Sequence, residues 1–175
     1  MIRSRAVLSA GSNVGDRLDH LTTVVERLAD DLVATSAVYS TPPWGGVEQD
    51  DFYNITLIVE GAKRPDDWLE ICHELEQSAD RTREIRWGPR TLDVDVISVS
   101  YDGEVVRSDD PDLLLPHPRA VERAFVLVPW LAIDPEAALW TPEGVRPVAD
   151  LVEHLDADER AGVRPVADLP GVGPR

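Results

Sequence analysis

The sequence is poor in lysine, in cysteine and in long apolar runs. Basic residues number 17 among 175, with Lys63 the single lysine, whereas 33 residues are acidic, so the formal net charge is −16. This acidity disfavours binding to nucleic acid or to an anionic membrane surface. The single cysteine, Cys72, excludes an intramolecular disulfide bond and fits a reducing compartment. No apolar run reaches the roughly 18–20 residues of a membrane span. We therefore expect a cytoplasmic protein.

The chain is long enough for one domain with a buried core. From Ala157 onward its composition turns to proline, glycine and charged residues. The sequence therefore predicts a folded domain over residues 1–156 and a loosely held C-terminal tail over residues 157–175.

The hydrophobic pattern switches between the period of a strand and that of a helix. Helical stripes follow Asp16, a plausible N-cap, and Pro65, which suits the first turn of a helix. Asp102-Gly103 is typical of a hairpin turn. Strand patterns cover residues 6–10, 32–40, 52–59 and 93–100, and further helices are predicted over about 119–133 and 147–155. This order predicts an α+β fold: a ferredoxin-like βαββαβ antiparallel sheet with packed helices and an added β-hairpin.

One of these strands carries two aspartates. Alternation along residues 92–97 puts Asp93, Asp95 and Ile97 on one face and the apolar residues between them on the other. Aspartate is disfavoured in strands, and like charges on one face repel each other. A solvated polar face would explain the pair, and so would a metal site, because carboxylates two residues apart on a strand point the same way.

A cluster of four arginines comes directly before this strand: Arg81, Arg83, Arg86 and Arg90, opposed only by Glu84. Solvated arginines paired with nearby glutamates would explain each one singly. As a set, their guanidinium groups suit phosphate oxygens. Mg²⁺ prefers carboxylates together with substrate phosphates. We therefore predict that the aspartates hold Mg²⁺ and that the arginine loop holds a polyphosphate. The glycine-rich loop G-x-x-x-x-G-K-[ST] is absent.

Other side chains suited to a ligand lie in loops. Trp44 and Trp87 stand among glycines and prolines, where an exposed indole often serves a ligand or a lid. His117 stands between two prolines and could present a hydrogen-bond donor, although a surface-turn histidine is the plainer interpretation. For Phe52 and Phe125, core packing is the default interpretation.

Several motifs together resemble one enzyme family. They are "GSN.GDR", "Y.TPPWG", "F.N", "RWGPR.LD.D" and "PHP......FVL.P", spread over residues 6–129. In order and spacing they are similar to 6-hydroxymethyl-7,8-dihydropterin pyrophosphokinase, an enzyme of the folate pathway. The resemblance implies transfer of diphosphate from ATP to the hydroxymethyl group of the pterin, with release of AMP.

The resemblance also implies roles for individual residues. Asp93 and Asp95 would bind two Mg²⁺ ions, with Arg81 and Arg90 on the phosphates as further catalytic residues. The ATP side would be formed by Glu76, Arg81, Arg83, Trp87, Arg90, His117 and Arg123. The pterin slot would be formed by Thr41, Pro42, Trp44, Phe52, Asn54 and Phe125, with the two phenylalanine rings around the pterin and the Asn54 amide on its edge.

The expected partners are these small molecules alone, without nucleic acid or membrane, and we expect a monomer. Two alternatives stay open on the residues themselves. One is a Mg²⁺-dependent nucleotidyl transferase acting on another small alcohol, which would release pyrophosphate. The other is a non-catalytic nucleotide-binding module in which the aspartates face solvent.

Overall fold

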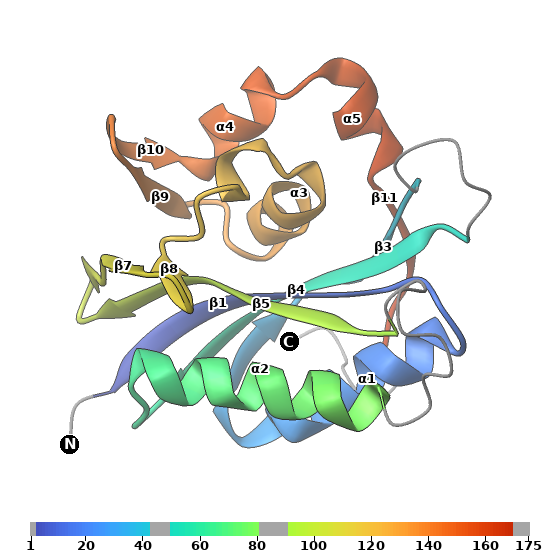
Figure 1. Cartoon of the computed structure of the whole chain (residues 1–175). Helices are drawn as coiled ribbons and strands as arrows, with labels where there is room; N and C mark the ends of the chain where they lie inside the picture. Colours follow the sequence, from blue (N-terminus) through green and yellow to red (C-terminus); the bar gives the residue numbers. More distant parts are fainter. Residues whose placement is uncertain (1–2, 43–49, 81–90, 170–175) are drawn as a thin grey trace.

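An antiparallel sheet with helices on both faces forms the centre of the computed structural model, which describes residues 3–42, 50–80 and 91–169 (Figure 1). The helices are α1 (Arg17–Arg27), α2 (Pro65–Asp80), α3 (Ala124–Ile133), α4 (Val148–His154) and α5 (Ala157–Gly162), with single 3-10 turns at Ala29–Asp31 and Ala120–Glu122. The main sheet contains β1 (Ser4–Ser12), β2 (Leu32–Thr35), β3 (Val38–Thr41), β4 (Phe52–Gly61), β5 (Asp93–Tyr101), β6 (Glu104–Val105) and β11 (Arg164–Ala167). Two small hairpins are formed by β7 (Ser108–Asp110) with β8 (Leu113–Leu115) and by β9 (Ala138–Thr141) with β10 (Gly144–Pro147). In the described part of the chain, no helix is long and apolar enough to cross a membrane.

The strands follow the order β11-β3-β4-β1-β5-β6, and β2 also pairs with β4. Strand β1 lies in the middle and pairs with β4 along its whole length, from Ser4 opposite Gly61 to Ser12 opposite Tyr53. Its other edge pairs with β5, from Ser4 opposite Tyr101 to Gly11 opposite Asp93. Since side chains alternate along a strand, these two registers decide which residues of three strands share a face.

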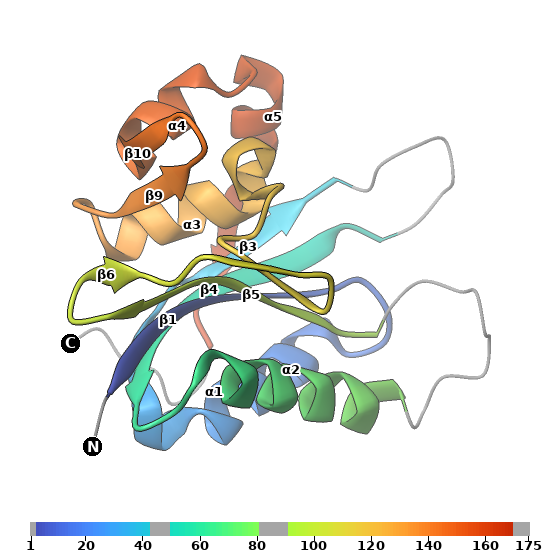
Figure 2. The same cartoon turned by 60° about the vertical axis from the view of Figure 1, so that its left-hand side comes forward.

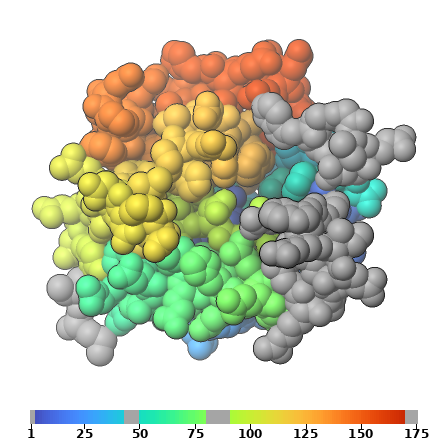
Figure 3. Space-filling view, in the orientation of Figure 1, coloured from blue at the N-terminus to red at the C-terminus, as the bar shows by residue number. Residues whose placement is uncertain are grey.

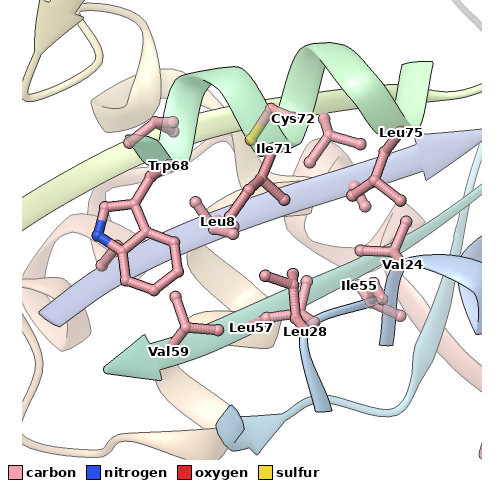
Figure 4. Packing of buried hydrophobic residues seen from close by; sticks show 14 of the residues in the cluster. Leu8, Val24, Leu28, Ile55, Leu57, Val59, Trp68, Ile71, Cys72 and Leu75 are labelled. Atoms are coloured by element: carbon pink, nitrogen blue, oxygen red, sulfur yellow. The ribbon is translucent and has the colours of Figure 1, made fainter. Parts of the chain in front are cut away.

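Helices α1 and α2 cover one face of the sheet, as both cartoon views show (Figure 2). Between them and the sheet lies the larger core, in which Leu8, Leu57 and Trp68 are fully buried (Figure 4). Cys72 belongs to this core, and burial raises the pKa of its thiol. Cys72 therefore serves as a small hydrophobic residue of the core.

Helix α3 lies on the opposite face and is itself covered by α4 (Figure 1). Val7, Ile58 and Ile97 meet Val126, Leu127 and Trp130 there in a second core cluster. A helix enclosed on both sides is apolar around its whole circumference. The segment "AFVLVPWLAI" of α3 has that composition, which explains the mixed pattern seen in the sequence.

The predicted elements are present, and two of them are divided. The strand predicted over residues 32–40 is divided into β2 and β3, because the Ser36 hydroxyl accepts a hydrogen bond from the Thr56 amide at 3.0 Å in place of a regular ladder contact. The helix predicted over about 119–133 is interrupted at Arg123, whose extended backbone (φ −101°, ψ 97°) separates a 3-10 turn from α3.

The C-terminal segment differs from the prediction of a loosely held tail. Strand β11 pairs with β3 at the edge of the main sheet, with Arg164 opposite Ser40 and Pro165 opposite Tyr39. Val163 and Leu169 are buried. The proline and charged residues of this segment suggested a tail, but an edge strand tolerates both. Residues 170–175 lie outside the described part of the chain.

Candidate active site

Polar residues gather at one end of the sheet face that α3 covers. At the other end this face is apolar, with Val7, Ile58 and Ile97 under α3. The polar end consists of two rows that run across β4, β1 and β5. The rows are Asn54, Gly11 and Asp93, and Thr56, Ser9 and Asp95, each with its β1 residue paired to both neighbours.

The two predicted metal ligands therefore share a face and stand in adjacent rows. Asp93 and Asp95 are both partly exposed, whereas Val94 between them is buried in the core under α1 and α2. This confirms the alternation predicted for the strand. In the space-filling view, residues of β5 reach the surface between α2 and the segment that leads into α3 (Figure 3).

The outer edge of β5 is closed by side chains and loop segments rather than by a full strand. Strand β6 pairs only with Ser100 and Tyr101. Further along, the His117 amide donates to the carbonyl of Ile97 at 2.8 Å. The Val94 amide donates to Glu76 Oε2 at 3.2 Å. These contacts bring Glu76 and His117, both predicted on the ATP side, to the strand that carries the aspartates.

Glu76 is a third carboxyl group beside this pair. Burial, together with the charges of Asp93 and Asp95 and a hydrogen bond with Asp93, raises the pKa of Glu76 to about 7, although the Val94 amide acts in the opposite direction. A carboxyl group with this pKa changes from protonated to ionised near neutral pH. The negative charge of the three groups therefore depends on pH when no cation is bound.

His117 is held in one orientation by the backbone. The Arg119 amide donates to His117 Nδ1 at 3.2 Å, so this nitrogen is an acceptor and the proton of the neutral ring resides on Nε2. Burial is the main cause that lowers the pKa of His117, and the nearby Arg123 and Arg119 add to the effect while Asp95 opposes it. The residue is therefore neutral at physiological pH and offers an Nε2–H donor.

Arg123 connects the aspartates to the start of α3. Its Nη1 lies 3.5 Å from Asp95 Oδ2, and its guanidinium carbon lies 5.6 Å from the centre of the Phe125 ring. The extended backbone of Arg123 before α3 allows the side chain to reach back over β5. The sequence alone would have placed Arg123 within a continuous helix.

Asn54 is fixed at the other end of its row. It is 4% exposed, and its Nδ2 donates to Thr41 Oγ1 at 2.9 Å. A Cβ atom on Gly11 would lie 2.5 Å from Asn54 Oδ1, so only glycine leaves space for this amide. The neighbouring Thr56 is fully buried, and its hydroxyl donates to the Val126 carbonyl at 3.3 Å, which joins α3 to the same face.

Among the predicted residues, the structure places Asn54, Phe52, Asp93 and Asp95 on one face of the sheet. Phe52 shares this face because it lies two residues before Asn54 on β4. Thr41 contacts Asn54, Glu76 and His117 lie at the edge of β5, and Arg123 and Phe125 lie at the start of α3. The predicted residues Trp44, Arg81, Arg83, Trp87 and Arg90 lie outside the described part of the chain.

Two residues of the site were missed in the sequence. Gly11 and Ser9 occupy the central positions of the two polar rows. The sequence suggested that the first strand ends at Ala10, whereas β1 continues to Ser12. A polar residue and a glycine within an otherwise apolar strand were the available signal, because strand glycines often mark a close approach of another group.

The described side chains supply only part of a ligand set for Mg²⁺. Over residues 3–42, 50–80 and 91–169, no group of three or more histidine, cysteine or acidic side chains has the arrangement of a complete metal site. Two partly exposed carboxylates on one face match an ion that takes its remaining ligands from substrate phosphates and water.

Comparison with known proteins gives a consistent result. Residues 7–135 match the family described as 7,8-dihydro-6-hydroxymethylpterin-pyrophosphokinase. The 2-amino-4-hydroxy-6-hydroxymethyldihydropteridine pyrophosphokinase of Mycobacterium tuberculosis (strain ATCC 25618 / H37Rv) is 45% identical over 167 residues, which cover 92% of this chain and 89% of the relative. The protein of the same name from Mycobacterium leprae is 48% identical over 169 residues, covering 92% and 88%.

A solved structure supports the fold. The chain is similar to the Plasmodium falciparum HPPK-DHPS protein crystallised with pterin and p-hydrobenzoate, with a TM-score of 0.61 and 13% sequence identity. The similarity covers 92% of this chain and 47% of the longer one. At this level of identity it concerns the fold alone.

Replacing Glu76 with glutamine should change how stability depends on pH when Mg²⁺ is removed by EDTA. The folded pKa of about 7 lies above the unfolded value of roughly 4.3. The stability that Glu76 contributes is thus fully present below pH ~4.3 and is lost as the pH rises through 7. The difference in melting temperature, Glu76→Gln minus wild type, should therefore be larger at pH 8 than at pH 5. The exposed Glu70→Gln on the same helix is the control, and equal pH profiles for wild type and Glu76→Gln would contradict the prediction.

Proposed function

Because the chain belongs to the 7,8-dihydro-6-hydroxymethylpterin-pyrophosphokinase family, we propose that Asp93 and Asp95 form the metal-binding centre of its active site. The chain is a pyrophosphokinase of folate biosynthesis. It transfers diphosphate from ATP to the hydroxymethyl group of 6-hydroxymethyl-7,8-dihydropterin and releases AMP. The observation that carries the proposal is the row Asn54, Gly11 and Asp93, which joins a candidate pterin contact to a candidate metal ligand across three strands.

Asp93 and Asp95 would hold two Mg²⁺ ions together with the phosphates of ATP. Their partial exposure and shared face support this role. Bound Mg²⁺ neutralises charge on the triphosphate and makes the hydroxyl group more acidic. Arg123 would complete the electrostatic setting, because its guanidinium lies 3.5 Å from Asp95 and can neutralise phosphate oxygens next to it.

The ATP side would be formed along the outer edge of β5. Glu76 and His117 lie there, and the Nε2–H of His117 supplies a donor for an oxygen or nitrogen acceptor of the nucleotide. Arg81, Arg83, Trp87 and Arg90 precede β5 in the chain and would complete this side, with Arg81 and Arg90 on the phosphates. We assign no general base among these residues, because Mg²⁺ held by Asp93 and Asp95 would lower the pKa of the attacking hydroxyl, whose proton would pass to solvent.

The pterin slot would lie between β4 and the start of α3. Phe52 and Phe125 would stack on the two faces of the heterocycle, and Asn54 would bond to its edge. Thr41 holds the Asn54 amide, and Pro42 and Trp44 follow it in the chain. The Thr56 bond to the Val126 carbonyl supports this role, because it fixes the distance between β4 and the helix that carries Phe125.

We also assign the core of the fold to the ferredoxin-like class. The element order β1, α1, β3, β4, α2, β5, the strand order β3-β4-β1-β5 and the two helices on one face support this assignment (Figure 1). In this arrangement the last residue of β3 and the first residue of β5 lie at the same end of the sheet. That end carries Asn54 and Asp93.

Asp93→Asn and Asp95→Asn should each leave the fold intact and lower kcat by about two to three orders of magnitude. Removing one of two repelling charges does not harm the apo protein, whereas the stabilisation that a metal gives to phosphoryl transfer is worth several kcal/mol. Asp109→Asn, an exposed aspartate on β7, is the control. Near wild-type turnover of either variant at saturating Mg²⁺ would refute the metal assignment.

Chromatography of the wild-type reaction tests the leaving group. With ATP, Mg²⁺ and 6-hydroxymethyl-7,8-dihydropterin, AMP should accumulate in step with a pterin that carries two phosphates. Free pyrophosphate with an adenylylated product would indicate a nucleotidyl transferase, and ADP with a monophosphorylated pterin would indicate an ordinary kinase.

Gly11→Ala should weaken pterin binding while the fold persists. The new methyl group would meet Asn54 Oδ1 at 2.5 Å, so the amide must turn and lose its bond to Thr41. One lost hydrogen bond corresponds to ~0.5–1.5 kcal/mol, which is about a two- to twelvefold rise in the Kd for the pterin. Gly61→Ala is the matched control, because it places a methyl group 2.9 Å from Asp31 Oδ1 at the opposite end of β4. Equal pterin affinity in both variants would contradict the role of Asn54.

A further inference from the structure

The segment after α4 packs against the proposed pterin slot, although it lies beyond the matched family region of residues 7–135. Helix α5 leads into β11, which lies alongside β3 at the edge of the sheet (Figure 1). Strand β3 ends at Thr41, the residue that holds the Asn54 amide. The C-terminal segment is therefore attached to the strand from which the slot begins.

Two consecutive residues of this segment reach the slot from its outer side. A Cβ atom on Gly162 would lie 3.5 Å from Pro42 Cδ and 3.7 Å from its Cγ, so the backbone of Gly162 lies directly against the proline ring. Val163 is 6% exposed and packs with Tyr39 and Ala124 in a small cluster. Phe125 and Leu155 pack against the same cluster.

These contacts are concentrated on one side of the segment. No residue of α5 is buried, and Val166 on β11 is 49% exposed. The backbone turns from helix to strand at Val163, whose amide donates to the Arg160 carbonyl at 3.3 Å. Within residues 157–167, Val163 is the buried position, and it lies next to the Pro42 contact and in the cluster against which Phe125 packs.

We propose that Gly162 and Val163 are positioning residues that form the outer support of the pterin slot. They hold Pro42 at the end of β3 and Phe125 at the start of α3, so that the spacing between the two sides of the slot is fixed before the pterin binds. A preformed slot lowers the cost of ordering these side chains on binding. The inference rests on the proposed pterin roles of Pro42 and Phe125.

The consequence is a separation between the two substrates. Most of the ATP side is built from α2, the outer edge of β5 and the segment around His117, whereas only Arg123 lies next to the cluster of Val163, beside Ala124 and Phe125. Loosening the support should therefore affect the pterin more than the nucleotide. A purely structural role would instead reduce the amount of active enzyme and leave both KM values unchanged.

The test uses the full-length protein with Val163→Ala, Gly162→Leu and the control Val166→Ala. Val163→Ala removes buried contacts next to Phe125, and Gly162→Leu pushes a side chain toward Pro42 without removing any core contact. For both variants the KM for the pterin should rise several-fold, and so should the Kd for the pterin measured in the presence of a non-hydrolysable ATP analogue. The KM for ATP should change less than twofold. Val166→Ala should behave as wild type.

The inference is overturned if the pterin KM stays constant in both variants or if the KM values for ATP and pterin rise together. Asn54→Ala distinguishes this failure from that of the slot itself. Its pterin KM should rise strongly if Asn54 contacts the pterin. An unchanged pterin KM in Asn54→Ala would overturn the proposed pterin slot. A raised pterin KM in Asn54→Ala, with wild-type values in Val163→Ala and Gly162→Leu, would overturn only the supporting role of Gly162 and Val163.

Discussion

The pairing of β1 with both of its neighbours is the constraint on which the site depends. Nine residues of β1 are opposite β4, and eight pair with β5, so the side chains of three strands are placed together. A shift of one residue in either pairing would move Asn54 or Asp93 to the opposite face, into the core under α1 and α2. The cost of burying an unpaired carboxylate there opposes such a shift. The core thus fixes the register, and the register fixes the site.

The same face of the sheet has both a structural and a chemical part. Its apolar end binds α3 through Ile58 and Ile97, and its polar end holds the two rows with the aspartates. The β1–β5 register shifts between Val7 and Leu8, which leaves Ile97 without a paired partner on β1. Such a bulge re-aims side chains at a strand position next to a site. It accounts for Ile97 packing under α3 while Val99, two residues later, lies in the core under α1 and α2.

The charges at the proposed nucleotide side differ from the charge of the chain as a whole. The chain is strongly acidic, yet its proposed nucleotide side combines three carboxyl groups with Arg123 and a neutral His117. Burial, and then the neighbouring charges of Asp93 and Asp95, raise the pKa of Glu76, so the three carboxyl groups together favour a bound cation. The edge of β5 is closed by Glu76 and His117 instead of a complete strand, so the groups that protect the edge are also those proposed to meet the nucleotide.

The sequence by itself determined the order of strands and helices up to residue 101, the N-cap Asp16, the shared face of Asp93 and Asp95, and the family. These features depend on local periodicity and on motifs, which are properties of neighbouring residues. Only the tertiary structure decided that Gly11 stands between Asn54 and Asp93, that the backbone breaks at Arg123, and that residues 164–167 belong to the sheet. The reason is that each of these depends on pairing or packing between segments far apart in the chain. A polar edge strand such as β11 has no apolar alternation of its own to reveal it.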